Sequence, residues 1–174
     1  TGVAYQFSRQ SADAAVLMPS PGSDVSDGST AFSDYERQRS ARLGLNWRIP
    51  AIVGRRSVRH VLYDTNFWKS FLMARLAVPM GDPGCLSLFG HDRERHLLLA
   101  EHLTAEYRIR TEGRGRVVDE WKLRPESFDN HWLDGLVGCA VGASMLGATV
   151  PGMSTAKSAA PQQRLRLSSL RRQN

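Results

Sequence analysis

The strongest constraint on the fold is a stretch that changes from a strand pattern to a helix pattern without an intervening loop. Val58–Tyr63 combines Val, Leu and Tyr in a short run and predicts a strand. Thr65 or Asn66 then supplies a helix N-cap, and large apolar residues recur at helical spacing up to Pro79, at positions 67, 71, 72 and 76. A strand that leads directly into an amphipathic helix is typical of α/β folds, in which helices pack on a sheet.

The rest of the chain predicts further strands and two more helices. Strands are expected at Val3–Ser8, Ala14–Met18, Leu43–Val53, Tyr107–Thr111 and Arg116–Leu123. The first two are expected to form a hairpin, and the last two flank a Glu-Gly-Arg-Gly sequence that is a strong hairpin signal. Amphipathic helices are expected at His91–Leu103 and Asp129–Leu146. Together these elements predict a mixed sheet with the final helix packed across it.

Two packing expectations follow from the helices. The second helix should turn Leu97, Leu98 and Leu99 toward the core. The final helix carries three glycines along one side, Gly135, Gly138 and Gly142. Because each glycine costs a helix interior up to ~1 kcal/mol relative to alanine, we interpret them as a face that packs closely on the sheet.

Composition divides the chain into one domain and a tail. Residues 1–147 are expected to form the domain, with 19–40, rich in Ser, Gly, Asp and Pro, as a loop or insertion. Five of the 23 basic residues and none of the 17 acidic ones lie after position 156, so the net charge of +6 belongs mostly to residues 148–174. This basic segment is expected to be disordered, and it either contacts nucleic-acid phosphates or is only a solubilising or unselected tail.

Several classes of protein are excluded. No apolar run approaches the ~18–20 residues that cross a bilayer, and the first residues carry no secretory signal. The motifs of P-loop ATPases, GxSxG hydrolases and HExxH metalloproteases are absent from the sequence. Cys85 and Cys139 are too few for a disulfide scaffold or a four-cysteine zinc site, and both are expected to be small buried residues.

The remaining candidates for chemistry are acidic. Asp64 follows the predicted central strand, Asp134 lies one turn into the last helix, and Glu106 lies at a helix-to-strand junction. Carboxylates from separate elements that meet at one sheet edge suit a two-metal phosphoryl-transfer site. From the residues alone the alternative stays open that Asp64 caps a helix, Asp134 interacts with its macrodipole and Glu106 caps the turn before Tyr107.

Three segments, in matching order, resemble signatures of one family, the C-terminal nuclease domain of the lambda-type (GpA-like) phage terminase large subunit. The strand-end pattern D-T-x-x-x-K corresponds to Asp64, Thr65 and Lys69. The sequence LTAE stands whole at residues 103–106, and the helical pattern N-x-x-L-D corresponds to Asn130, Leu133 and Asp134. The similarity covers about residues 1–147.

This resemblance implies an RNase H-like endonuclease domain of an ATP-driven packaging motor in the host cell cytoplasm. It implies cleavage of double-stranded phage DNA with Mg²⁺ or Mn²⁺, ATP binding only in a domain outside this chain, and a terminase small subunit and a portal protein as partners. The implied metal ligands are Asp64 and Asp134, with Glu106 as a further catalytic carboxylate. Asn130 is implied to support a carboxylate and Lys69 to contact a DNA phosphate.

One departure from the family pattern affects the expected activity. Relatives carry an Asp on the first strand of the domain, and Thr1–Tyr5 corresponds to the sequence just after it. We therefore expect the first strand and the first metal ligand to be missing. The alternative function is a catalytically inactive RNase H-like prophage remnant that only binds DNA or partner proteins. An unrelated RNase H-like enzyme, such as a transposase or resolvase, is a third hypothesis.

Overall fold

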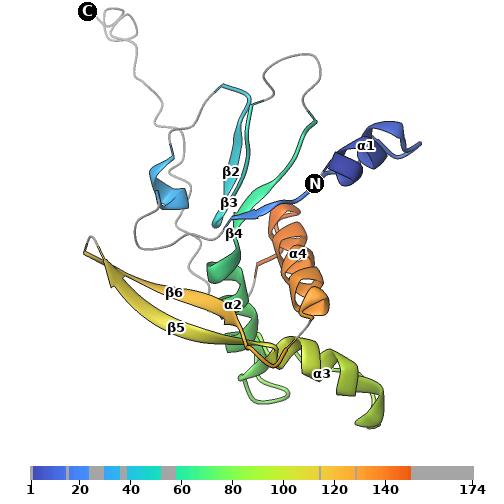
Figure 1. The fold of residues 1–174 in the computed structure, drawn as a ribbon, viewed down its shortest axis with the longest axis vertical. Coiled ribbons are helices and arrows are strands. Elements are labelled where there is room, and N and C mark those ends of the chain that lie inside the picture. Colours follow the sequence, from blue (N-terminus) through green and yellow to red (C-terminus); the bar gives the residue numbers. More distant parts are fainter. Residues whose placement is uncertain are drawn as a thin grey trace, which may run out of the picture.

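The computed structural model describes residues 2–14, 16–23, 30–35, 39–51, 58–113, 115–127 and 129–149. Within them lie a four-stranded sheet with strand order β1-β4-β3-β2, a two-stranded hairpin and four α-helices (Figure 1). The predicted mixed sheet with flanking helices is therefore confirmed. Among the described helices, none combines the length and apolar character that crossing a bilayer requires.

The sheet forms around β4 (Leu62–Asp64). This strand pairs in parallel with β1 (Gly22–Ser23) and antiparallel with β3 (Trp47–Ile49), which pairs antiparallel with β2 (Arg42–Gly44). Two residues connect β2 to β3, and Asn46 adopts a φ of 49°, a left-handed conformation that asparagine tolerates better than most residues. This tight turn brings the two short strands back on each other.

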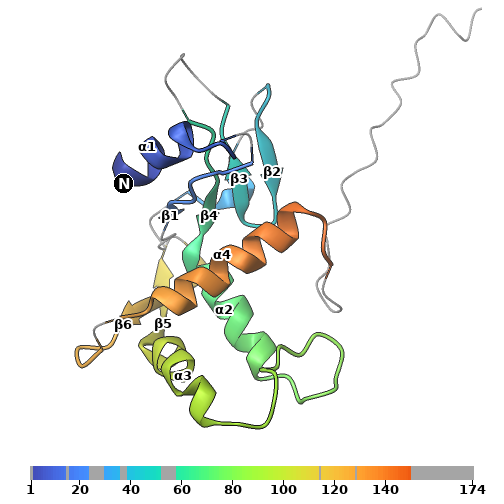
Figure 2. The same cartoon turned by 90° about the vertical axis from the view of Figure 1, so that its right-hand side faces the viewer.

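Two helices, α2 (Thr65–Leu76) and α4 (His131–Met145), pack against the sheet. Asp64 ends β4 and caps α2, because its Oδ1 accepts a hydrogen bond from the Phe67 backbone N–H at 3.1 Å. Figure 2 shows α4 passing across β4 with α2 beside it. The core is closed by side chains from the sheet and from both helices: Trp47, Ile49, Val61, Tyr63, Trp68, Leu72, Val137 and Val141.

The hairpin of β5 (Glu106–Gly113) and β6 (Arg116–Leu123) curves away from the four-stranded sheet and packs on α2 (Figure 1). Trp121 forms two hydrogen bonds across this contact. Its backbone N–H donates to Asn66 Oδ1 and its indole Nε1–H donates to Ser70 Oγ, both at 2.9 Å. These bonds anchor the first two turns of α2 to the middle of β6.

The remaining helical elements of the described residues are two α-helices and two 3₁₀ turns. A 3₁₀ turn (Glu94–His96) leads into α3 (Leu97–Thr104), which ends just before β5. Another 3₁₀ turn (Phe32–Asp34) precedes β2, and α1 (Gly2–Gln10) stands beside the sheet at the N-terminal end (Figure 2).

The predictions for the middle of the chain hold best. The helix expected after Tyr63 is α2, the Gly-rich turn joins β5 and β6, and the last expected helix is α4. That helix packs across the sheet, as expected, although it does so through Val137 and Val141. The N-cap of α2 is Asp64 rather than Thr65 or Asn66.

The strands predicted for the first eighteen residues are wrong. Residues 3–8 lie inside α1, because Val3 and Phe7 are four apart and fit a helical period as well as a strand pattern. At residues 14 and 16 the backbone turns, and the N–H groups of Val16 and Leu17 both bond to Asp13 O at 2.9 Å. These two segments therefore do not form a hairpin.

Two other strand predictions are too long. The segment expected at Leu43–Val53 breaks into β2 and β3 at the turn around Asn46, and its last two residues lie outside the described residues. In the segment expected at Val58–Tyr63, only the last two residues belong to β4. Val61 instead bonds through its backbone N–H to Pro19 O at 3.0 Å.

The packing expectations for the helices are also corrected. A Cβ at Gly135, Gly138 or Gly142 would meet nothing within 4 Å, so these glycines are not a close-packed face. The buried side of α4 is formed by Leu133, Val137 and Val141 at four-residue spacing. In α3, Leu97 and Leu98 are 58% and 51% exposed, because the helix begins at Leu97 and buries His102 and Leu103 instead.

Parts of the expected loop and tail lie outside the described residues. Of the segment 19–40, positions 24–29 and 36–38 are not described, while its described part contains β1 and a 3₁₀ turn. The segment 148–174 is described only at its first two residues, so the expectation of disorder there stays a prediction.

Gly44→Ala should destabilise the protein, whereas Gly135→Ala should not. A Cβ at residue 44 would overlap the indole ring of Trp47, which is buried in the core, but a Cβ at residue 135 has open space. We expect Gly44→Ala to cost about 1–3 kcal/mol and Gly135→Ala, in a helix interior, to gain up to ~1 kcal/mol. Urea denaturation measures both free energies of unfolding, and equal values for the two variants would contradict this packing.

Candidate functional site

A buried charged cluster lies where α2, the start of β5 and the start of α4 meet. Lys69 Nζ is 2.6 Å from Glu106 Oε1 and 3.3 Å from Asp134 Oδ1. Asn130 donates from Nδ2 to the same Glu106 Oε1 at 2.5 Å. We call these four residues the Lys69 cluster. Of the five site residues expected from the sequence, the structure brings these four together.

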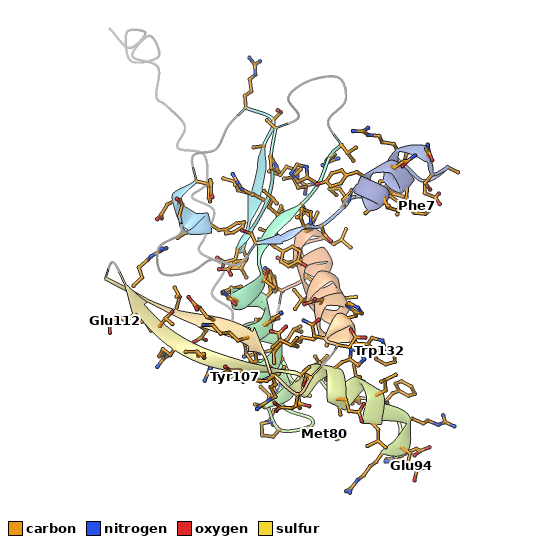
Figure 3. The ribbon with its side chains drawn as sticks, in the orientation of Figure 1. Phe7, Met80, Glu94, Tyr107, Glu112 and Trp132 are labelled. Atoms are coloured by element: carbon orange, nitrogen blue, oxygen red, sulfur yellow. The ribbon has the colours of Figure 1, made fainter. Side chains whose placement is uncertain are left out.

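The ends of secondary-structure elements position the two acids of the cluster. Glu106 is the first residue of β5, directly after the α3-to-β5 junction. Asn130 precedes α4, and the backbone N–H of Asp134 donates to Asn130 O at 3.1 Å, so both residues lie on one side of the first helical turn. Figure 3 labels Tyr107 and Trp132, the sequence neighbours that mark this junction.

Lys69 is buried because helix α2, to which it belongs, packs against the core on one side and against the hairpin on the other. Its helix neighbours Trp68 and Leu72 lie in the core, and Asn66 and Ser70 bond to the hairpin. The Lys69 side chain is only 8% exposed and that of Glu106 only 4%. Burial of an unpaired charge is very costly, so the ammonium and the carboxylate stabilise each other in this environment.

The two acidic residues differ in which carboxylate oxygens are available to a ligand and in how exposed they are. Glu106 Oε1 accepts two hydrogen bonds, whereas Glu106 Oε2 is buried and has no hydrogen-bond partner among the described residues. This carboxylate therefore does not cap the turn before Tyr107. Asp134 is 47% exposed on its side chain and lies at the solvent side of the cluster. Together they offer one inner and one outer carboxylate around a single ammonium group.

Tyr63 is a neighbour of the site that the sequence analysis did not single out. Burial of its phenol raises the pKa of Tyr63, and the negative charge of Asp134 raises it further. The residue was missed because an apolar strand residue carries no motif. Tyr63 directly precedes Asp64 and lies on the opposite face of the strand. This position was the sequence feature that could have indicated its place beside the site.

Asp64 makes contacts outside the Lys69 cluster. Its Oδ1 caps α2, and Asp64 lines a pocket of about 300 Å³ together with Ser70 of α2 and with Arg110 and Asp119 of the hairpin. Successive side chains of a strand point to opposite faces, so Asp64 points away from the face on which Tyr63 packs. The helix-capping role that the residues alone suggested for Asp64 is therefore present.

The Lys69 cluster fits one divalent cation better than two. Mg²⁺ is usually held by one or two carboxylates together with water and phosphate oxygens, and Glu106 and Asp134 supply two carboxylates. The unpartnered Glu106 Oε2 is an acceptor of the type that such an ion requires. Among the described residues, however, no group of three or more His, Cys, Asp or Glu side chains is placed to hold a metal ion.

A second feature is an apolar pocket of about 630 Å³ between α2 and α4. It is lined mainly by aromatic and aliphatic side chains, among them Trp47, Trp68 and Phe71, and none of the Lys69 cluster residues lines it. Cys85 and Cys139 both lie on its wall. The expectation that both cysteines are buried is wrong for Cys139, which is exposed, while Cys85 is half-buried.

One comparison with known proteins finds a match. A family model described as "Terminase large subunit gpA, endonuclease domain" matches residues 1–154. No curated protein and no solved structure matches the chain. The matched region contains every member of the Lys69 cluster, the central strand β4 and the hairpin.

Proposed function

The chain belongs to the gpA endonuclease-domain family of terminase large subunits, and on this premise we propose that it cleaves double-stranded phage DNA with the help of a divalent cation. The family supports a nuclease role in phage DNA packaging. The finer proposal is a Mg²⁺- or Mn²⁺-dependent phosphodiester hydrolysis at the Lys69 cluster. Its further parts are an RNase H-like arrangement of the sheet and helices and action in the host cell cytoplasm.

The observation that carries the proposal is the Lys69 cluster itself. Residues from three separate elements converge on two carboxylates, one of them with a buried oxygen that no described residue satisfies. Glu106 and Asp134 would hold the cation, which when bound supplies a Lewis acid for a phosphoryl oxygen. Asn130 fixes the orientation of the Glu106 carboxylate through its 2.5 Å hydrogen bond.

The two carboxylates differ in exposure, and we therefore propose different roles for them. Glu106 is enclosed and cannot reach DNA, so its part is to anchor one side of the site. Asp134 is half-exposed at the mouth of the cluster, where a phosphodiester can approach. Asp64 stays a proposed ligand on the strength of the family resemblance, and the pocket beside it gives its carboxylate access to solvent.

Family membership also supports proposals about partners. DNA is the substrate, and the terminase small subunit and the portal protein are proposed as packaging partners. ATP is proposed to act in a domain outside this chain, because the sequence contains no P-loop motif.

One observation favours a second candidate function. Lys69 already neutralises the carboxylates of the cluster, and the described residues hold two acids there rather than three. A catalytically inactive domain that only binds DNA or partner proteins is consistent with this arrangement.

Incubation of the chain with linear double-stranded DNA distinguishes the two functions. Because the first metal ligand of the family is expected to be missing, we expect fragments to accumulate slowly with Mn²⁺ or Mg²⁺, without added ATP, and cleavage to stop when EDTA removes the cation. Cleavage that continues in EDTA would contradict the cation dependence. A folded chain that binds DNA but leaves it intact at every Mn²⁺ concentration would support the inactive domain instead.

A further inference from the structure

The geometry points to a further role for Lys69, one that rests on the proposed function. Its ammonium group is the resident counter-ion of the site, and a divalent cation displaces it on binding Glu106 and Asp134. Lys69 Nζ lies 2.6 Å from an oxygen of Glu106 and 3.3 Å from an oxygen of Asp134. A cation held by both carboxylates, through these oxygens or through the unpartnered Glu106 Oε2, lies beside the ammonium group, and the two positive charges repel each other.

The contacts of Glu106 allow a cation to replace Lys69, an exchange of one positive partner for another, while the carboxylate keeps its position. Asn130 Nδ2 bonds to Glu106 Oε1 independently of Lys69 and keeps this carboxylate in place when the ammonium leaves. Glu106 Oε2 is buried and unpartnered among the described residues, so Lys69 does not use the whole acceptor capacity of the carboxylate. The site therefore exchanges one positively charged partner for another of higher charge.

The exposed side of the cluster determines where Lys69 goes. Lysine carries its charge on a flexible four-carbon stem, and the open side of the cluster is at the half-exposed Asp134. A displaced Lys69 ammonium reaches solvent there, where DNA phosphates also approach. Lys69 thus changes its partner: it pairs with Glu106 and Asp134 before the cation binds and with a DNA phosphate afterwards.

Lysine accessibility tests the exchange on the unmodified chain. The sequence contains three lysines, at positions 69, 122 and 157, and mass spectrometry can follow the acetylation of each. We expect Mg²⁺ to speed acetylation of Lys69 by at least about tenfold, since ligand binding shifts the population of the displaced state. The half-exposed Lys122 should react at an unchanged rate. A Lys69 rate that does not change at saturating Mg²⁺ would overturn the exchange.

The affinity for Mn²⁺, measured by electron paramagnetic resonance, gives a second test. Lys69→Met removes the competitor and should tighten Mn²⁺ binding by at least about tenfold, whereas Lys122→Met, which removes the same charge from the hairpin, should not change it. If Glu106→Gln weakens Mn²⁺ binding but Lys69→Met fails to strengthen it, the exchange is wrong and the proposed function stands. If neither variant changes Mn²⁺ binding, both are wrong.

Discussion

Replacing Glu106 by leucine should lower the free energy of unfolding by about 3–5 kcal/mol, the range found when one partner of a buried ion pair is removed. The variant leaves the buried Lys69 ammonium with Asp134 as its remaining ion-pair partner among the described residues, and Asn130 loses its acceptor. Urea denaturation measures the loss. For a domain with an ordinary stability of about 5–15 kcal/mol this is a large fraction of the total.

A matched control on the same hairpin separates burial from charge. Glu120 forms an ion pair with Lys122 at 3.7 Å, and the side chains of the two residues are 20% and 53% exposed, respectively. Exposed ion pairs contribute about 0–1 kcal/mol, and because this pair is open to solvent at Lys122, Glu120→Leu should cost clearly less than Glu106→Leu. A loss for Glu106→Leu no greater than that for Glu120→Leu would contradict a buried, mutually dependent cluster.

The double variant Lys69→Met/Glu106→Leu extends the test. Apolar replacement of both partners of a buried ion pair is often neutral or stabilising, and Asp134 is exposed enough to be solvated by water. We therefore expect the double variant to be more stable than Glu106→Leu alone. A double variant that loses the sum of both single losses would show that the two residues do not depend on each other.

Asp134→Asn should abolish DNA cleavage without unfolding the domain. Loss of an outer-shell partner typically costs metal sites ~10–100-fold in affinity or activity, and the loss of a direct ligand should exceed about a hundredfold. The side chain is half-exposed, so the cost in stability should be small. Gel analysis of linear DNA incubated with Mn²⁺ measures the rate.

Asp129→Asn is the control for this variant. Asp129 lies just before α4, is exposed to a similar degree and pairs with His131 at 3.0 Å rather than with the cluster. We expect its cleavage rate to stay close to that of the unchanged chain. Undiminished cleavage by Asp134→Asn, or an equal loss in both variants, would remove Asp134 from the proposed site.

The parts of the fold that sequence patterns predicted are those with a local cause. The change of period after Tyr63 marks α2, and the Gly-rich turn after Thr111 marks the β5–β6 hairpin. The N-terminal strands were wrong because Val3 and Phe7 suit two periodicities and only tertiary contacts decide between them. The glycines of α4 were misread for the same reason: spacing does not reveal which side of a helix faces the sheet.

The candidate site was predictable as a set of residues but not as a geometry. The family resemblance selected Lys69, Glu106, Asn130 and Asp134, which the structure places in contact. No local pattern indicated that Lys69 is buried and pairs with Glu106 across 37 residues of sequence. The influence of Asp134 on Tyr63 likewise depends on the packing of α4 against β4.

Anomalous scattering from crystals of the chain soaked in Mn²⁺ tests the proposed site most directly. We expect one strong peak in contact with the carboxylates of Glu106 and Asp134, with the Lys69 ammonium moved away from both. A peak at Asp64 in the pocket beside the hairpin and none at Glu106 and Asp134, with the Lys69–Glu106 ion pair intact, would contradict the assignment of the nuclease site to the Lys69 cluster.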